Sequence, residues 1–389
     1  MARRIIRWLA GSLPLVAVAC ASAAGDSVST DEAAVTAPVA ASGRPVLPNW
    51  ATAEEEAIER GAPPPRTARR SVAPPTGYRV PAEYEPVQAV VMTWAGHPSV
   101  LRAVAAASAA AGADVWMVGG PSYLPNVPAS RYRALDLDFD SIWSRDYGPV
   151  GIHEPTGKLA IVDTTYRHYA ARPSDDAMSC ALATELGGEC FTTSLILDGG
   201  NYMTDGRGNA FLTSRIYDWN SALPTATVDA LLKSYLGVET LHIFDYAKTP
   251  YGSPADGTGH IDMFAKLLGE CKVAVVETTS APFKAVSDSA AAYFKTLSCA
   301  PGRTYEVTRL RGWYSAGTWY TYSNSLIVNN TAIIPFYNNS ARNAEAVQAY
   351  STALPGYTVV GVNSEETIVQ GGSIHCVTRE IPKAAPPVP

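Results

Sequence analysis

The sequence has no excess of basic residues. It contains 30 lysines and arginines against 36 aspartates and glutamates, which gives a net charge of −6. Proteins that bind nucleic acids carry clusters of Lys and Arg that neutralise phosphates. This charge balance therefore argues against a nucleic-acid partner. It is better suited to a cationic ligand, although long-range charge of this size changes binding rates only modestly.

The sequence also has few long apolar runs. Beyond the N-terminus, none is long enough to form a transmembrane helix. Three arginines among the first seven residues precede an apolar run over residues 8–19, which is typical of a signal peptide. We therefore expect residues 1–24 to be a signal peptide and the protein to be exported, either secreted or held in the cell envelope.

Two ways of processing this leader fit the sequence. Cys20 follows Ala17-Val18-Ala19, which resembles a bacterial lipobox. Cys20 is therefore a candidate for lipidation, which would tether the protein to a membrane. Alternatively, the small residues at positions 22–24 suit an ordinary signal peptidase. The lipoprotein is our first expectation.

The six cysteines lack the spacing of a zinc site, because no two of them are separated by only two to four residues. Cys20 and Cys376 are set aside, the first for processing and the second for reasons given below. The other four permit three pairings in an oxidising compartment. We predict the two pairs closest in sequence, Cys180–Cys190 and Cys271–Cys299. The alternative is four buried free thiols.

Large apolar side chains are scarce between residues 25 and 77, where Ala, Pro, Ser and Thr dominate. Such a segment buries too little surface to offset the entropy lost on ordering. We therefore predict a disordered linker over residues 25–77 and a disordered tail over residues 383–389. Residues 78–382 remain as the folded domain.

Within this domain, short apolar runs alternate with Ala-rich stretches of helical spacing, which predicts an α/β fold. The predicted strands cover residues 87–94, 114–118, 159–163, 210–213, 239–244, 263–267, 273–277, 305–310, 325–328, 332–335 and 357–362. The predicted helices cover residues 99–111, 176–186, 225–235, 282–297 and 341–354. No internal repeat is evident, and the order of strands in the sheet does not follow from the pattern.

Polar, charged and Gly residues gather in four segments: 143–149, 198–206, 259–262 and 371–376. In the last, Cys376 follows Gly371 and Gly372, which let the backbone approach a ligand closely. A thiol outside the predicted disulfides of an exported protein is either a liability or a nucleophile. The glycines favour the nucleophile over a buried structural cysteine. We do not expect the adjacent His375 to serve as its base, because neighbouring side chains of a strand point apart.

Two other segments contain possible partners for this thiol. His260 and Asp262 are two residues apart, so a strand would place an imidazole and a carboxylate in one pocket. Asp146 and Trp143 could bind a cation through a carboxylate and an aromatic face. Each pair also has a plainer explanation. His260 and Asp262 could form a turn and a cap, and Asp146 could pair with Arg145 in a turn.

Taken together and in this order, the segments resemble the bacterial agmatine deiminase and peptidylarginine deiminase family. The resemblance runs through residues 81–86, 143–149, 199–206, 259–263, Asn324 and residues 371–382, and so covers nearly the whole predicted domain. It implies that residues 78–382 are a deiminase catalytic domain. The implied fold is the pentein fold, a five-bladed α/β propeller, and no metal or organic cofactor is implied.

The resemblance also implies roles for individual residues. Cys376 would be the nucleophile, His260 the general acid and base, Asp146 and Asp262 the carboxylates that hold the guanidinium, Asn324 a polar neighbour of the thiol, and Trp143 a wall of the pocket. The thiolate would add to the central carbon of the guanidinium and form a covalent thiouronium. His260 would protonate the departing ammonia and then activate water.

The family acts on two kinds of guanidine, free agmatine and arginine in peptides. The expected export favours peptidyl or C-terminal arginine, which would become citrulline. The segment that contains Asn201 favours it too, because it lacks a His usual in agmatine enzymes. Asn201 and Arg172 are candidate substrate-binding residues, the latter for a C-terminal carboxylate. Agmatine is the alternative substrate. Two alternatives have no deiminase activity. One is a thiol protease or transglutaminase that uses Cys376 and His260, and the other is an inactive binding protein of the cell envelope.

Overall fold

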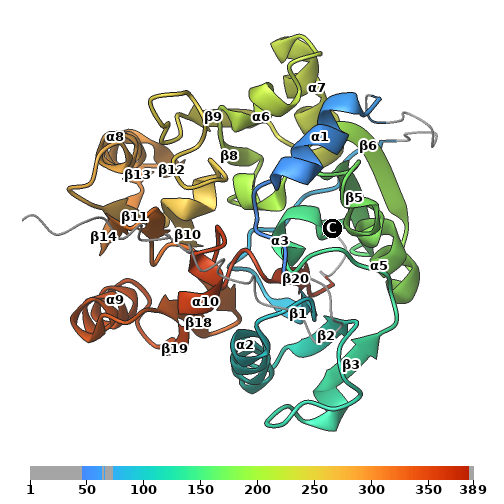
Figure 1. The fold of residues 1–389 in the computed structure, drawn as a ribbon, viewed down its shortest axis with the longest axis horizontal. Coiled ribbons are helices and arrows are strands. Elements are labelled where there is room, and N and C mark those ends of the chain that lie inside the picture. The colour runs from blue at the N-terminus through green and yellow to red at the C-terminus, as the bar shows by residue number, and fades with distance from the viewer. Residues whose placement is uncertain (1–45, 64, 66–72, 385–389) are drawn as a thin grey trace, which may run out of the picture. The chain divides into compact units, whose positions relative to one another are not determined.

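The computed structural model describes residues 46–63, 65 and 73–384 of the 389-residue chain (Figure 1). The predicted signal peptide, including Cys20, lies outside the described residues, and so do residues 385–389 of the predicted tail. Among the residues that are described, no helix has both the length and the apolar character needed to cross a membrane.

Five sheets with the same arrangement of strands make up most of the described domain. In each sheet the first strand pairs antiparallel with the second. A helical crossover then leads from the second strand to a third, which pairs parallel with it. Parallel strands need such a crossover because a tight turn cannot connect them. The α/β class predicted from the alternating pattern is therefore confirmed.

Four of these sheets are continuous in sequence. They contain β4 (Val150–His153), β5 (Leu159–Thr165) and β6 (Cys190–Ile196); β7 (Met203–Thr204), β8 (Asn209–Thr213) and β9 (Thr240–Phe244); β10 (Ala265–Gly269), β11 (Lys272–Glu277) and β14 (Glu306–Arg311); and β17 (Leu326–Val328), β18 (Thr331–Phe336) and β19 (Thr358–Asn363). Their crossovers contain α4 (Pro173–Asp176) and α5 (Met178–Leu186); α6 (Arg215–Trp219) and α7 (Thr225–Leu236); α8 (Phe283–Thr296); and α9 (Ser340–Ala353).

The fifth sheet joins the two ends of the folded domain. Its order is β20 (Arg379–Pro382), β1 (Val87–Thr93), β2 (Asp114–Val118) and β3 (Tyr132–Leu135), with α2 (Pro98–Ala110) between β1 and β2. β1 is buried along nearly its whole length, as a Val-rich strand between two neighbours should be. Two short ribbons complete the strands: β12 (Ser298–Ala300) with β13 (Arg303–Thr304), and β15 (Trp313–Ser315) with β16 (Thr318–Tyr320).

Each sheet is preceded by a short polar segment just before its first strand. These segments are α3 (Ser144–Tyr147), η2 (Gly199–Asn201), η3 (Ile261–Met263), the turn at residues 323–325, and residues 371–376. The other short helices are η1 (Ala129–Arg131) and α10 (Glu365–Ile368). The polar segments thus occupy equivalent positions in five like units. The units share geometry rather than residue identity, which explains why no repeat is evident in the sequence.

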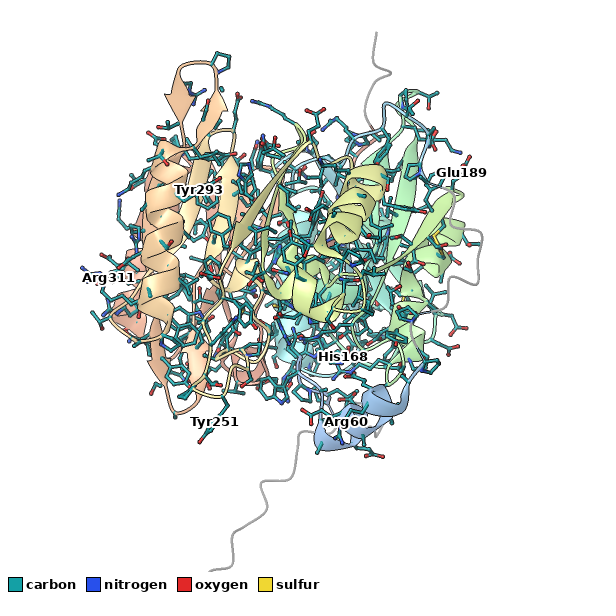
Figure 2. All side chains as sticks on the ribbon, turned by 90° about the horizontal axis from the view of Figure 1, so that it is seen from above. Arg60, His168, Glu189, Tyr251, Tyr293 and Arg311 are labelled. Carbon is teal, nitrogen blue, oxygen red and sulfur yellow. A yellow bond between two sulfur atoms is a disulfide. The ribbon has the colours of Figure 1, made fainter. Side chains whose placement is uncertain are left out.

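The prediction of a disordered linker over residues 25–77 was wrong for residues 46–63. There the chain forms α1 (Ala53–Gly61), which begins at a capping box made by Thr52 and Glu55. The buried Glu55 carboxylate pairs with Arg172, 2.8 Å from its Nε. Figure 2 shows α1, which ends near the labelled Arg60, close to His168, whose ring bonds Glu59. Ion pairs and hydrogen bonds order this segment, so its low content of apolar residues did not predict its structure correctly.

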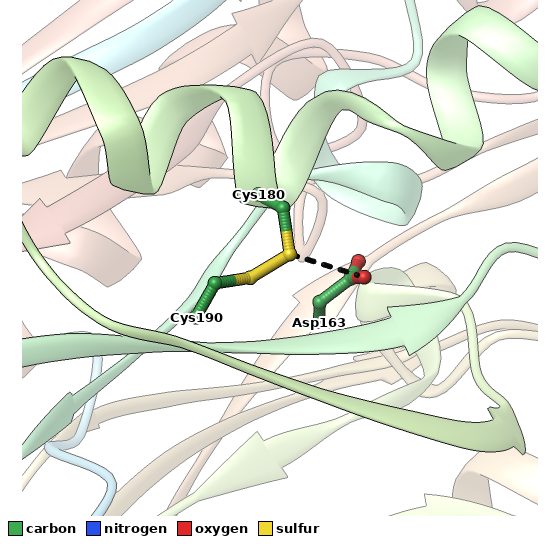
Figure 3. Close-up of side chains that lie close together, drawn as sticks. All are labelled: Asp163, Cys180 and Cys190. Carbon is green, nitrogen blue, oxygen red and sulfur yellow. Dashed lines mark hydrogen bonds between the residues drawn. A yellow bond between two sulfur atoms is a disulfide. The ribbon is translucent and has the colours of Figure 1, made fainter. Parts of the chain in front are cut away.

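The two predicted disulfides, Cys180–Cys190 and Cys271–Cys299, are both formed. The first joins α5 to the start of β6, with Asp163 of β5 beside it (Figure 3). Among the described residues Cys376 is the one free cysteine, and it is buried. The domain therefore keeps a single thiol in its interior, as the cysteine count predicted.

Candidate active site

The structure brings Cys376, Asn324 and Asp262 into direct contact. The thiol sulfur of Cys376 lies 3.1 Å from Asn324 Nδ2 and 3.6 Å from Asp262 Oδ2. Asn324 Nδ2 also donates to Asp262 Oδ2 at 3.0 Å. All three side chains are buried. They come from the segments before β20, β17 and β10, so three of the five units meet at the thiol.

Gly200 marks the small space that the remaining groups surround. A Cβ atom at this position would lie 2.6 Å from His260 Nδ1, 2.8 Å from Asp146 Oδ1 and 3.1 Å from Asp262 Oδ2. Only glycine leaves room for three functional groups to approach the backbone this closely. The five predicted catalytic residues are thus gathered around one point.

Trp143 flanks the thiol as the predicted pocket wall. A Cβ atom at Gly372 would lie 2.5 Å from the sulfur of Cys376 and 2.9 Å from the ring of Trp143. The Gly pair that precedes the cysteine therefore lets the indole and the thiol approach the same stretch of backbone. Trp143 itself is fully buried, and its Nε1 donates to the carbonyl of Leu47 at 2.9 Å.

His260 is held between two carboxylates. Its Nε2 lies 3.1 Å from Asp198 Oδ2, and its Nδ1 lies 3.6 Å from Asp146 Oδ1. Asp198 in turn pairs with Arg167, whose Nε is 2.8 Å away. The predicted strand over residues 263–267 begins only at Ala265, and His260 instead directly precedes η3. This tight turn, not the alternation of a strand, brings His260 and Asp262 into one site.

These contacts shift the pKa values of the acidic and basic groups. Burial alone would lower the pKa of His260, but the charges of Asp146 and Asp198 outweigh it and raise that pKa. Burial raises the pKa of Asp146 to about 6, and repulsion from Asp198 and Asp262 adds to the effect against the attraction of His260. His260 therefore favours its protonated form, as a proton donor should.

The thiol is held in its protonated form by the same surroundings. Burial, and then the carboxylates of Asp262 and Asp146, raise the pKa of Cys376 well above its usual value. A cation bound between those carboxylates would oppose both effects, because it would neutralise the charges that disfavour a thiolate. A positively charged ligand would therefore favour the thiolate form of Cys376.

Two buried atoms of the site have no hydrogen-bond partner within the described part of the chain: His260 Nδ1 and Asp262 Oδ1. Carboxylates are also prominent in the site: Arg167 pairs with Asp198, His260 lies between Asp198 and Asp146, and His375 bonds Asp262. A buried polar atom without a partner is costly, so such atoms commonly point to a ligand. A cation with several N–H donors in one plane, such as a guanidinium, could donate to Asp262 Oδ1 and would reduce the excess of negative charge.

His375 contributes to the site in a way that the sequence did not reveal. Its Nδ1 lies 2.7 Å from Asp262 Oδ2, and its Nε2 lies 2.9 Å from Glu83 Oε2. It therefore holds the carboxylate beside the thiol and is not placed as the base of Cys376. Glu83 was missed as well, because it lies far away in sequence at the domain start. Asp198 was missed as a partner of His260, although the run Asp198-Gly199-Gly200 marked the segment.

Arg172 and Asn201 do not fit the substrate-binding roles predicted for them. Arg172 is fully buried and already holds the Glu55 carboxylate, at 2.8 Å from Nε and 3.0 Å from the second guanidinium nitrogen. It is not free for a substrate carboxylate in this conformation. Asn201 is also buried and accepts from the backbone amide of Thr213 at 3.0 Å. It fixes the loop that carries Gly200, because its amide bonds the neighbouring strand β8.

Asp146, Asp198 and His260 are also close enough together to hold a metal ion, with one ligand atom from each within 4.8 Å of the others. Arg167 already supplies a positive charge to Asp198, and His260 another. The group formed by Asp163, Cys180 and Cys190 meets the same distance criterion, but its two sulfurs are bonded to each other (Figure 3). Neither group calls for a metal to explain its geometry.

A buried thiol beside an imidazole and two carboxylates fits a hydrolase that acts on C–N bonds of amidines. Comparison with known proteins agrees. The chain belongs to the Porphyromonas-type peptidyl-arginine deiminase family, whose model matches residues 79–382. The match ends at the last residue of β20 and leaves α1 outside it.

Individual relatives are similar in sequence, and solved structures share the fold. A protein of Photobacterium profundum, provisionally named an agmatine deiminase, is 26% identical over 359 residues, covering 79% of this chain and 96% of its own. The agmatine deiminase of Enterococcus faecalis has the same fold, with a TM-score of 0.69, 22% identity, and coverage of 79% and 97%. A provisionally named arginine deiminase of Porphyromonas gingivalis matches with the same TM-score and identity, and coverage of 79% and 99%.

Proposed function

We propose that this protein hydrolyses the terminal guanidinium of a small free guanidine, with agmatine as the first candidate. The observation that carries the proposal is the space beside Gly200, where Asp146, Asp262 and His260 converge next to the Cys376 thiol. Agmatine is favoured over arginine in peptides because the similar proteins named above include agmatine deiminases. The side chain predicted to bind a C-terminal carboxylate, Arg172, is also occupied.

The chemistry follows from the geometry. Asp146 and Asp262 would hold the guanidinium through charge-assisted hydrogen bonds, which orient its central carbon toward Cys376. The bound cation lowers the cost of deprotonating Cys376; the thiol proton passes to solvent, and the thiolate adds to that carbon. The C–N bond then breaks as His260 donates a proton to the leaving nitrogen, and ammonia departs. Water, deprotonated by His260, adds to the thiouronium carbon and releases the urea-type product and the thiol.

Arginine in a peptide is a second candidate because one observation favours it. Trp143 Nε1 donates to a main-chain carbonyl, that of Leu47, and Arg172 donates to the carbonyls of Pro48 and Trp50. Groups beside the site can therefore bind the main chain of a peptide. A substrate peptide would have to replace residues 47–50 to use them.

A substrate panel tests both candidates. The full chain is assayed for ammonia and for the urea-type product with agmatine, free arginine, benzoyl-arginine amide and a peptide that ends in arginine. We expect agmatine to have the highest kcat/KM. Higher kcat/KM for either peptide substrate would reverse our order, and peptide-bond cleavage seen by mass spectrometry would support the protease alternative.

Cys376→Ala supplies the matched control for the panel. We expect it to lose at least about 10³-fold in kcat, because the covalent route has no other nucleophile. Circular dichroism and the melting temperature should stay near those of the parent, since the change removes a single buried sulfur. Turnover that persists in this variant would refute the proposed role of Cys376.

We also propose that the five like units close into a five-bladed propeller around this site. Three observations support it: each unit has the same strand plan, β20 joins the two ends of the domain through β1, and the site segments occupy equivalent positions. A ring brings equivalent loops to one centre. That would explain how residues from all five units reach the same small space.

Finally, we propose that the protein is exported and that Cys20 carries a lipid. The two disulfides support an oxidising compartment, where such bonds persist. Mass spectrometry of the N-terminus and cell fractionation test the proposal. Cys20→Ala should release the protein from the membrane fraction. An unprocessed N-terminus in the cytosolic fraction would contradict export.

A further inference from the structure

Residues 47–50 cross the candidate active site as a strip of main chain that bends at Asn49 and Trp50. Their contacts are those of a bound peptide: Trp143 donates to the carbonyl of Leu47 at 2.9 Å, Arg172 donates to the carbonyls of Pro48 and Trp50 at 2.9 and 3.1 Å, and the amide of Asn49 donates to the carbonyl of Gln370 at 2.7 Å. The strip is therefore held largely through its backbone.

One side chain of the strip enters the site. Asn49 is fully buried, and its Nδ2 donates to Asp146 Oδ2 at 3.0 Å. The other oxygen of Asp146 accepts from the backbone amide of Gly200, also at 3.0 Å. Both oxygens of this carboxylate are thus engaged, so a guanidinium cannot form two parallel bonds with it until Asn49 leaves.

The strip is also fixed on both sides of Asn49. Arg167 donates to Asn49 Oδ1 at 2.9 Å, and a Cβ atom at Gly371 would lie 3.0 Å from Asn49 Cβ and 3.1 Å from the Trp50 ring. Further along, α1 is anchored by the ion pair of Glu55 with Arg172. Trp50 is 38% exposed, so the strip lies between the catalytic groups and the surface.

The strip is an addition to the common domain. The family match covers residues 79–382, whereas the strip and α1 lie within residues 46–63. The catalytic groups belong to the shared part of the chain, and the segment that covers them does not. A covering element of this kind adds nothing to the five-unit fold itself, which indicates a role in controlling access.

We propose that residues 47–50 form an intramolecular pseudosubstrate, in which the Asn49 amide takes the place of one guanidinium N–H on Asp146. In this state the enzyme is closed, and substrate competes with its own N-terminal segment. The proposal rests on the proposed function for the identity of the substrate, but not for the closure of the site. When only a fraction of molecules is open, the apparent KM rises in inverse proportion to that fraction.

The test uses the full chain with three single substitutions. Asn49→Ala removes the bond to Asp146, Glu55→Gln weakens the anchor of α1, and Glu54→Gln is the control, because Glu54 is exposed on the same helix. The first measurement is the rate at which iodoacetamide labels Cys376, followed on the Cys376 peptide by mass spectrometry. The second assay gives KM and kcat for agmatine.

We expect Asn49→Ala to speed labelling and to lower KM by about tenfold, the effect of losing one hydrogen bond to a charged group, with kcat within about twofold. Glu55→Gln should also speed labelling and lower KM, and Glu54→Gln should change neither the labelling rate nor KM. Unchanged labelling in both site variants, or a higher KM in Asn49→Ala, would overturn the proposal, since Asn49 would then assist substrate binding. If labelling accelerates but no variant deiminates agmatine, the pseudosubstrate stands and the proposed function fails.

Discussion

Two clusters of buried charge lie side by side in this domain and differ in their balance. The carboxylate cluster contains Asp146, Asp198 and Asp262 with His260 and Arg167. The paired cluster contains Arg145, Lys266 and Arg379 with Glu83 and Glu380. His375 joins them, because one of its nitrogens bonds Asp262 and the other bonds Glu83.

In the paired cluster each carboxylate faces at least one cation. Glu380 bonds Arg145 at 2.6 Å and Glu83 contacts Lys266, Arg145 and His375. Burial raises the pKa of both glutamates, but these cations outweigh it and lower them. In the carboxylate cluster the pKa of Asp146 instead remains raised. Removing one partner from a fully paired buried network destabilises the fold, whereas a cluster in which a carboxylate keeps a raised pKa is a candidate ligand site. The difference separates structural charge from functional charge.

The most direct test of this difference removes one carboxylate from the carboxylate cluster. Asp146→Asn keeps the shape of the side chain but removes the charge that would orient the guanidinium. We expect kcat/KM for agmatine to fall by about 10²-fold, mainly through KM, because two charge-assisted bonds are weakened. The free energy of unfolding should change little. Loss of stability with an unchanged KM would place Asp146 among the structural charges.

The converse change removes one carboxylate from the paired cluster. Glu380→Gln leaves Arg145, which is fully buried, with the longer 3.4 Å contact to the Glu83 carboxylate and a 3.3 Å bond to the carbonyl of His375. We expect the free energy of unfolding to fall by about 3 kcal/mol, as for breaking a buried ion pair from one side. Urea denaturation measures it. KM for agmatine should not change at temperatures where the variant is folded.

An exposed ion pair gives the control for that measurement. Lys158 and Glu189 lie 3.4 Å apart with about half of each side chain exposed. Glu189→Gln should leave the urea midpoint unchanged, because exposed pairs contribute little. An equal loss of stability in both variants would show that burial of Arg145 is not what makes Glu380 important.

The pH dependence of the reaction sharpens the comparison further. The raised pKa of Asp146, about 6, means that its carboxylate is charged only above that pH. We expect kcat/KM to fall by about tenfold for each pH unit below 6, because the protonated acid no longer attracts a cation. In Asp146→Asn this limb should flatten. An acidic limb near pH 4 that survives the substitution would assign it to another group.

The smallest expected effect concerns the residue that joins the clusters. His375→Asn removes the 2.7 Å bond to Asp262 but leaves the charge of that carboxylate in place. We expect kcat to fall by roughly tenfold, since Asp262 would lose its orientation toward the thiol, while KM changes less. His375→Gln, whose longer amide can reach Asp262, should recover part of the rate. A KM effect without a kcat effect would contradict this positioning role.

Much of the site could be predicted from the sequence. The residues that were not predicted were missed for one common reason. Cys376, His260, Asp262, Asp146 and Asn324 lie in short motifs whose order marks the family, and the structure gathers them in one place. The partners Glu83, His375 and Asp198 carry no local signal for their contacts. Their roles depend on which loops face one another, and that is set by the packing of five separate units.

The fold divides in the same way. Alternating apolar and Ala-rich runs placed the strands and helices that they predicted to within a few residues, because burial of one face imposes its period on the sequence, but β3, β4, β6 and β20 were missed. The pairing of β20 with β1 joins opposite ends of the domain, and no local pattern encodes it. The N-terminal segment was predicted wrongly for a related reason. Its order comes from contacts with Arg167, Arg172 and Asp146, not from its own composition.

The sequence by itself therefore predicted the class of fold, the two disulfides and the residues that meet in the candidate site. Only the tertiary structure decided that Arg172 binds Glu55 and that Asn49 lies on Asp146. The physical reason is that apolar periodicity and short motifs depend on residues that are close together in the sequence. The pairing of buried charges is decided by which side chains share the same interior space, because each needs an opposite charge or a hydrogen-bond partner within reach.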